Sequence, residues 1–133
     1  MIEINNRTKA RINKKLVKTV AEKFAAKYKI KNKEVSIAFV SDSEIKKLNK
    51  QYRHKNEVTD VLSFDGEGDF FGEILIDYAQ IKRQAKESSK EIDEELVFIL
   101  VHGLLHLVGY DDEKEKGRVE MVRLGERFIK KIF

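Results

Sequence analysis

The stretch that decides the fold is LVFILVHGLLHLVGYDD, which spans residues 96–112. Its first part is apolar on every side of a helix, a pattern typical of a central helix that other elements cover. His102 and His106 lie four residues apart, so a helix places both imidazoles on one face. A buried imidazole pair needs partners for its polar nitrogens. We therefore expect a metal site on a central, buried helix.

A glycine and an acidic residue complete the motif. Gly109 follows His106 by three residues, and there it can take the left-handed conformation that ends a helix and turns the chain back. Asp112 can then return to the histidines as a third ligand. The spacing, H-x-x-x-H-x-x-G-x-x-D, is that of the long zinc motif of metzincin proteases, but Gly103 stands where a protease has its glutamate base. The pattern therefore predicts a catalytic type of metal site, with an open position for water, and excludes a peptidase.

The composition restricts which residues can bind a metal and indicates where in the cell the protein is expected. The chain has 133 residues and no cysteine, so thiolate zinc sites and disulfides are excluded. This length is typical of one domain, and we expect residues 1–133 to form a single catalytic domain. No apolar run approaches the roughly 20 residues that span a bilayer, and the N-terminus lacks the apolar core of a signal peptide. We therefore expect a cytoplasmic protein.

The net charge of +4 is distributed unevenly. Residues 1–33 contain eleven Lys or Arg residues and only two acidic ones, Glu3 and Glu22, so this segment carries +9 and the rest of the chain −5. A basic segment of this kind attracts polyanions such as nucleic acid, in a way that salt weakens. A solvated, lysine-rich helix face accounts for the same charge equally well.

Hydrophobic periodicity predicts an α+β fold in which a mixed β-sheet is packed with helices. Strands are expected at residues 2–6, 35–40, 61–64 and 70–77, and the last two form a hairpin around the glycine-bearing loop 65–69. Helices are expected at residues 9–28, 41–49, 78–90 and 116–132, and from residue 92 to the histidines. The helix at 41–49 begins with a capping box, Ser41 to Glu44, and a polar connection follows over residues 51–60. In the last helix, the residues expected to face inward are Val119, Val122, Leu124 and Phe128.

Two blocks of sequence carry a resemblance to a known family. One is HGLLHLVGYDD at residues 102–112. The other block comprises Leu48-Asn49, Tyr52-Arg53, Lys55 and Thr59-Asp60-Val61-Leu62-Ser63-Phe64, with Gly72-Glu73-Ile74 after it. In order and spacing these blocks resemble the YbeY family of bacterial ribosomal-RNA maturation endoribonucleases. The resemblance implies a mixed sheet packed with helices, a zinc-type site on the central helix, and metal-dependent cleavage of single-stranded RNA.

The resemblance also implies partners and residue roles. It implies action in 3′-end maturation of small-subunit ribosomal RNA and in ribosome quality control, with ribosomal RNA and the small subunit or its proteins as partners, and no DNA or membrane. By position, it assigns His102 and His106 as metal ligands and Arg53 as the functionally important arginine. We expect Arg53 to be catalytic, by stabilising charge on the reacting phosphate, and also to bind RNA. Lys55 and His54 are weaker candidates for RNA binding, and His54 lies outside the family pattern.

This chain departs from the family pattern at three positions. Asp112 replaces the third histidine, and Val58 and Asp65 replace two prolines, which should affect loop stiffness only. An aspartate adds negative charge to the ligand set, so Mn²⁺ or another hard divalent metal gains relative to Zn²⁺. Asp111 is an alternative ligand, one position off the spacing.

We therefore expect a metal-dependent endoribonuclease, a hydrolase of phosphodiester bonds. Two other interpretations remain open from the sequence: an RNA-binding ribosome-assembly factor whose metal is structural, and a metal-dependent hydrolase of small molecules. The sequence identifies no general base, because Gly103 occupies the usual place. It also leaves open whether water or the 2′-hydroxyl of the RNA attacks the phosphate.

Overall fold

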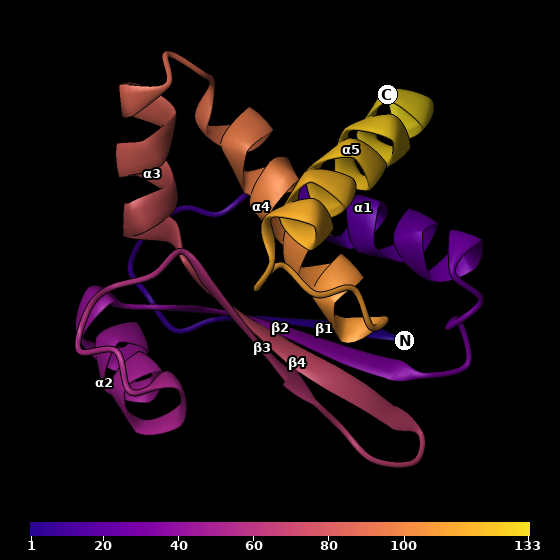
Figure 1. Ribbon diagram of the computed structural model, residues 1–133, viewed down its shortest axis with the longest axis horizontal. Coiled ribbons are helices and arrows are strands. Elements are labelled where there is room, and N and C mark those ends of the chain that lie inside the picture. Colours follow the sequence, from indigo (N-terminus) through magenta and orange to yellow (C-terminus); the bar gives the residue numbers. More distant parts are fainter.

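Four strands and five helices make up the chain, and the computed structural model describes all residues, 1–133 (Figure 1). The strands are β1 (Ile2–Asn6), β2 (Glu34–Val40), β3 (Val61–Asp65) and β4 (Phe70–Asp77). The helices are α1 (Lys14–Lys27), α2 (Asp42–Arg53), α3 (Tyr78–Glu87), α4 (Ile92–Leu107) and α5 (Glu115–Ile132). The expected α+β class is confirmed.

The strands form one mixed sheet in the order β1-β2-β4-β3. β1 and β2 pair in parallel, as do β2 and β4, whereas β3 and β4 are antiparallel. Parallel neighbours need a crossover connection, and α1 lies in the connection between β1 and β2. The expected hairpin is confirmed by the β3–β4 register, in which Val61 pairs with Ile76 and Asp65 with Gly72.

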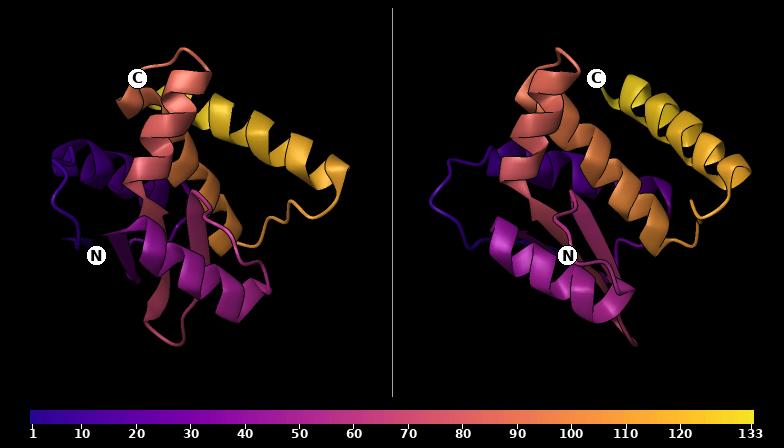
Figure 2. Two further views of the ribbon diagram at one scale, coloured as in Figure 1. Left: turned by 90° about the vertical axis from the view of Figure 1, so that its left-hand side faces the viewer. Right: turned by 60° about the vertical axis from the view of Figure 1, so that its left-hand side comes forward.

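Helices cover the two faces of the sheet unequally (Figures 1 and 2). Helices α1, α3, α4 and α5 lie on one face, and α2 lies alone on the other. Side chains that alternate along β2 serve both layers. Ile37 and Phe39 join the large core beneath the four helices, whereas Ala38 and Val40 join a smaller cluster with Ile45 of α2.

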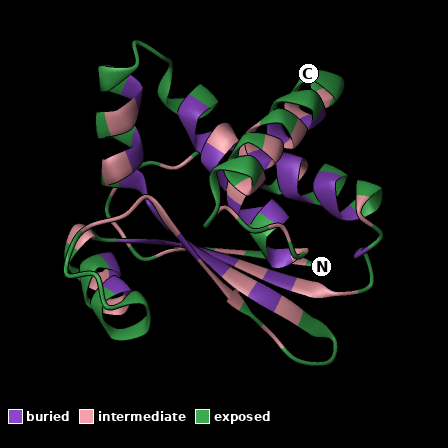
Figure 3. Ribbon diagram, viewed as in Figure 1, coloured by how far each residue is buried: buried purple, intermediate pink, exposed green.

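Helix α4 occupies the centre of the large layer, between α1, α3, α5 and the strands β3 and β4. Its side chains Leu96, Leu100, Leu104 and Leu105 are at most 1% exposed, and the helix is largely buried along its length (Figure 3). The expectation of a central, covered helix is confirmed. None of the helices combines the length and the apolar character needed to cross a membrane.

The start of α1 lies later than periodicity predicts, at Lys14 and not near residue 9. The side chain of Asn6 organises a turn instead: its Oδ1 accepts a hydrogen bond from Thr8 N (3.0 Å) and its Nδ2 donates to Ala10 O (2.9 Å). Asn13 then caps the helix by accepting from Leu16 N. Local side-chain bonds therefore override the apolar period here.

Two further expectations about helices are corrected. Helix α2 continues to Arg53, four residues beyond the expected end at Asn49, so part of the expected polar connection is helical. In α5, Val119 is 60% exposed and Met121 is buried in its place. The sequence pattern shows which side of a helix is apolar, but packing against the neighbouring elements decides which residues at the border of that side are buried.

Candidate active site

The end of helix α4 sets the direction of His106. Gly109 has φ of +109°, and the N–H groups of Gly109 and Tyr110 donate to the carbonyls of His106 (3.1 Å) and Leu105 (3.1 Å). These two bonds form a Schellman motif, which confirms the helix-ending role expected for the glycine. The turn brings the Tyr110 carbonyl to 2.8 Å from His106 Nδ1. Because a carbonyl only accepts, Nδ1 carries a proton, and in the neutral tautomer of this imidazole the lone pair is on Nε2.

Asp112 returns to both histidines. Its Oδ2 lies 3.1 Å from His102 Nε2 and its Oδ1 lies 3.8 Å from His106 Nε2. Burial raises the pKa of Asp112, but the hydrogen bond with His102 and the nearby His106 outweigh it and hold that pKa below its ordinary value. By contrast, the Asp111 side chain accepts a hydrogen bond from Glu113 N (2.9 Å) and does not line the pocket. The predicted set of His102, His106 and Asp112 is therefore brought together.

These three side chains do not stand as a formed metal centre, since no group of three or more His, Asp or Glu side chains is arranged to hold an ion. His102 and Asp112 form a hydrogen bond with each other instead. The donor set nevertheless fits a zinc-type ion. Imidazole nitrogen and carboxylate oxygen are both ordinary zinc ligands, and the Asp112 carboxylate lies 3.1 Å from His102 Nε2 and 3.8 Å from His106 Nε2.

Gly103 marks a close contact between α4 and the sheet. A Cβ at this position would lie 3.1 Å from Val61 Cγ2 and 3.3 Å from Ile74 Cγ2. The hydroxyl of Ser63 donates to the Gly103 carbonyl at 3.2 Å, which ties the helix to β3. A glutamate such as a protease carries at this place would require Val61 and Ile74 to shift, so the glycine favours the close packing of α4 on the sheet.

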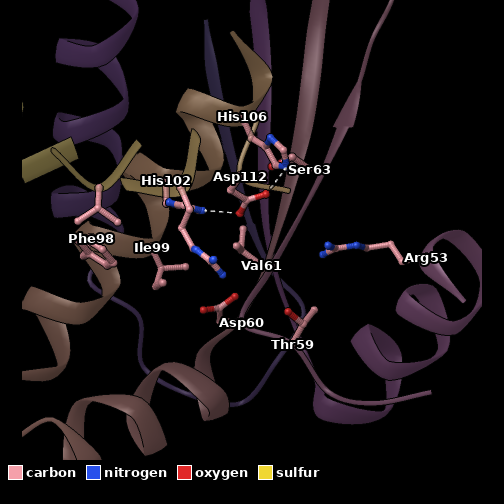
Figure 4. Close-up of a pocket in the computed structure, with 12 residues that line it drawn as sticks. Arg53, Thr59, Asp60, Val61, Ser63, Phe98, Ile99, His102, His106 and Asp112 are labelled. Carbon is pink, nitrogen blue, oxygen red and sulfur yellow. Dashed lines mark hydrogen bonds and ion pairs between the residues drawn. The ribbon is translucent and has the colours of Figure 1, made fainter. Parts of the chain in front are cut away.

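Helix α2 delivers Arg53 to the same place from the other side of the sheet. Ser41 caps the start of the helix, where its hydroxyl accepts from Glu44 N (3.2 Å). His54 ends the helix in the left-handed conformation, with φ of +58°. Tyr52 packs edge-on against Phe64 of β3, with the ring centres 5.1 Å apart. Arg53 is thus the last helical residue, and its guanidinium points toward the histidines and Asp112 (Figure 4).

The elements enclose a pocket of about 310 Å³ beside the histidines (Figure 4). Its lining comes from α2, the loop before β3, β3 itself, α4, the turn after α4, and α5: Arg53, Thr59, Asp60, Val61, Ser63, Phe98, Ile99, His102, His106, Asp112, Arg118 and Val122. Neither Arg53 nor Arg118 forms an ion pair with a protein carboxylate. The pocket therefore combines metal-type ligands with two unpaired guanidinium groups, which suits a phosphate group.

The pocket includes most of the predicted site residues, but not all. Lys55 and His54 do not line it, and neither does any residue of the basic segment 1–33. Asp60 and Arg118 line it without having been predicted as site residues. Asp60 lies in the block that carries the family resemblance, whereas Arg118 follows Asp112 in a charged stretch where no local pattern distinguishes it from its neighbours.

The chain is similar in sequence to known proteins. The chain matches the family Endoribonuclease YbeY over residues 2–132. Endoribonuclease YbeY of Finegoldia magna is 43% identical over 107 residues, which cover 76% of this chain and 70% of that protein. The enzyme of the same name from Persephonella marina is 37% identical over 118 residues, covering 84% and 77%.

A solution structure of a protein from Thermotoga maritima is similar along nearly the whole fold. It has a TM-score of 0.67 and 34% identity, and the match covers 97% of this chain and 87% of that one. The chain therefore belongs to the YbeY family of endoribonucleases, hydrolases of phosphodiester bonds.

Proposed function

We propose that this chain cleaves single-stranded RNA in the pocket described above, with a divalent ion held by His102, His106 and Asp112. The proposed RNA is the 3′ end of small-subunit ribosomal RNA, so that the protein acts in the cytoplasm in ribosome maturation and quality control. The observation that carries the site is the return of Asp112, from beyond the helix, to within 4 Å of both histidines. Zinc is the expected ion, and the carboxylate also admits Mn²⁺.

When bound, the ion supplies a Lewis acid for a phosphate oxygen or for a water molecule. The residues of the chain do the rest. His106 presents Nε2 because the Tyr110 carbonyl holds the proton on Nδ1. Arg53 and Arg118 bind the phosphate through charge-assisted hydrogen bonds and stabilise the negative charge that develops on it. Phe98 and Ile99 contribute apolar side chains to the lining of the pocket.

The test uses purified His102→Ala and His106→Ala variants. Both should lose the bound metal and at least about 100-fold of the cleavage rate on single-stranded RNA, while RNA binding and the melting temperature stay close to those of the wild type. His54→Asn is the matched control, because it removes the third imidazole, which is exposed and outside the pocket, and asparagine tolerates the left-handed backbone at this position. Cleavage within a few-fold of wild type in both variants would place the reaction elsewhere. Unfolding of both would indicate a structural metal.

A further inference from the structure

One ionisable side chain of the pocket, Asp60, is neither a proposed metal ligand nor a proposed phosphate-binding group. Six ionisable side chains line the pocket: Arg53, Asp60, His102, His106, Asp112 and Arg118. The arginines remain protonated in proteins, and the proposed metal ligands must keep their lone pairs for the ion. Asp60 is therefore the pocket side chain that can still accept a proton. Its carboxylate points into the pocket, below Asp112 in the view of Figure 4.

Asp60 is anchored on one side only. Its Oδ2 accepts a hydrogen bond from Gln84 Nε2 at 3.2 Å, and its main-chain carbonyl accepts from Asp77 N at 2.9 Å. Its Oδ1 has no protein partner and is not among the buried unpaired atoms, so it is accessible from the pocket. No Lys, Arg or His side chain pairs with the carboxylate.

The amide of Gln84 is locked in one orientation. Its Nε2 donates to Asp60 Oδ2 and also to Glu95 Oε2 at 2.8 Å, while its Oε1 accepts from Gln80 Nε2 at 3.1 Å. Glu95 is a buried carboxylate on α4, only 7% exposed. Reversal of the amide would aim an oxygen at two carboxylates, so the donor must face Asp60. Helices α3 and α4 thus hold the Asp60 carboxylate through a neutral donor.

We propose that Asp60 is the general base of RNA cleavage and that Gln84 is its positioning residue, an assignment that rests on the proposed function of the pocket. The Oδ1 atom takes the proton as the O–H bond of the attacking hydroxyl group breaks, whether that group belongs to water or to the RNA ribose. The oxygen forms the new bond to phosphorus. The bond from phosphorus to the leaving oxygen then breaks with its electron pair on that oxygen, which takes a proton from solvent.

The first variant to test is Asp60→Asn. The asparagine carbonyl still accepts from Gln84, but the amide cannot take a proton. The single-turnover cleavage rate on single-stranded RNA should fall about 100-fold or more, while metal content, RNA affinity and melting temperature stay at their wild-type values. Asp69→Asn, in the exposed hairpin turn, is the matched control and should cleave at the wild-type rate.

Three outcomes would overturn the role of Asp60. A cleavage rate within about threefold of wild type, with His102→Ala inactive in the same assay, rejects the base and leaves the proposed function intact. Loss of metal from Asp60→Asn identifies the carboxylate as a ligand instead. Loss of RNA affinity with an unchanged single-turnover rate identifies a binding role. Retained activity in His102→Ala, by contrast, rejects the proposed function itself.

The positioning role of Gln84 is tested by Gln84→Met alone and together with Asp60→Asn. Methionine is close to glutamine in shape but donates no hydrogen bond. If Gln84 acts through Asp60, the single variant should lose about tenfold in rate and should cause no further loss in the Asp60→Asn background. A merely structural effect, through the buried Glu95, would lower the rate equally in both backgrounds and would reject the positioning role.

Discussion

Asp112 is the residue on which the proposed metal site depends most, because it is the only carboxylate in contact with both histidines. Asp112→Ala leaves two imidazoles and should lower the metal content of the purified protein. Asp112→His replaces the oxygen by a neutral nitrogen ligand and should keep or raise the zinc content. Metal analysis by mass spectrometry measures both.

Asp111→Ala is the control for the Asp112 variants. The Asp111 carboxylate accepts a hydrogen bond from Glu113 N and lies outside the pocket, so its loss should leave the metal content unchanged. Unchanged metal in Asp112→Ala would remove Asp112 from the ligand set. Loss of metal in Asp111→Ala alone would assign the ligand role to Asp111.

A second carboxylate, Asp77, makes stability depend on pH. It is fully buried, its Oδ1 caps α3 by accepting from Gln80 N, and its Oδ2 has no hydrogen-bond partner. Burial, with a smaller effect of the neighbouring Asp42, raises the pKa of Asp77 from 3.8 to about 7. Between these two values the folded protein binds more protons at this site than the unfolded chain, so this carboxyl makes the protein less stable as pH rises.

Asp77→Asn should remove this dependence, because an asparagine still caps the helix and carries no charge. We expect the melting temperature of the wild type to fall relative to that of the variant between pH 5 and pH 8, about the window set by the raised pKa. Thermal unfolding followed by circular dichroism at both pH values measures the difference. A gap between the two proteins that is the same at both pH values would contradict the assignment.

At the scale of elements, the C-terminus of α4 connects folding to chemistry. Gly109→Ala forces a Cβ into a backbone with φ of +109°, which should lower the free energy of unfolding by about 1 to 3 kcal/mol. The same change should disturb the Tyr110 carbonyl that holds His106 Nδ1. We therefore expect lower stability in urea unfolding together with weaker metal binding.

Gly125→Ala is the matched control for Gly109→Ala. Gly125 lies inside α5, and an added Cβ would sit 3.6 Å from Val101 Cγ1 and 3.8 Å from Leu105 Cδ1, at ordinary contact distances. Alanine is favoured over glycine within a helix by about 1 kcal/mol, so this variant should be as stable as the wild type or more stable. Equal destabilisation by the two changes would show that the glycine turn has no special role.

At the scale of the whole molecule, the most basic segment of the chain lies outside the pocket. The strongly basic residues 1–33 do not line the pocket, whereas Arg53 and Arg118 reach it from α2 and α5. If the RNA backbone passes through the pocket, Arg118→Ala should weaken RNA binding and reduce the slope of log affinity against log salt by about 0.7. Fluorescence anisotropy over a salt series measures the slope.

Arg127→Ala, at an exposed position on the same helix, should leave the slope unchanged. Lys15→Ala with Lys18→Ala tests the alternative path along α1, where both lysines are exposed. A reduced slope in the double lysine variant, together with an unchanged slope in Arg118→Ala, would assign RNA binding to α1.

The sequence by itself determined the parts that depend on neighbours along the chain. The four-residue spacing of His102 and His106 places both side chains on one face of the helix, and Gly109 ends that helix because glycine readily adopts a positive φ. Ser41 caps α2 through a hydrogen bond from Glu44 N, three residues later. The hairpin β3–β4 likewise follows from two apolar segments around a glycine-bearing turn. Each of these features involves residues close in the sequence, so pattern and spacing are enough to predict it.

Only the tertiary structure decided which distant residues share the pocket. α2 packs on the sheet face opposite α4 and brings Arg53 in, while Lys55, two residues later, stays outside. α5 exposes Val119, buries Met121 and brings Arg118 to the pocket, and Gln84 of α3 holds Asp60. These placements depend on strand order and on the close packing of α4 at Gly103, which join segments far apart in the sequence. Such long-range contacts leave no periodic pattern in the local sequence, because each one depends on the shape of both partners.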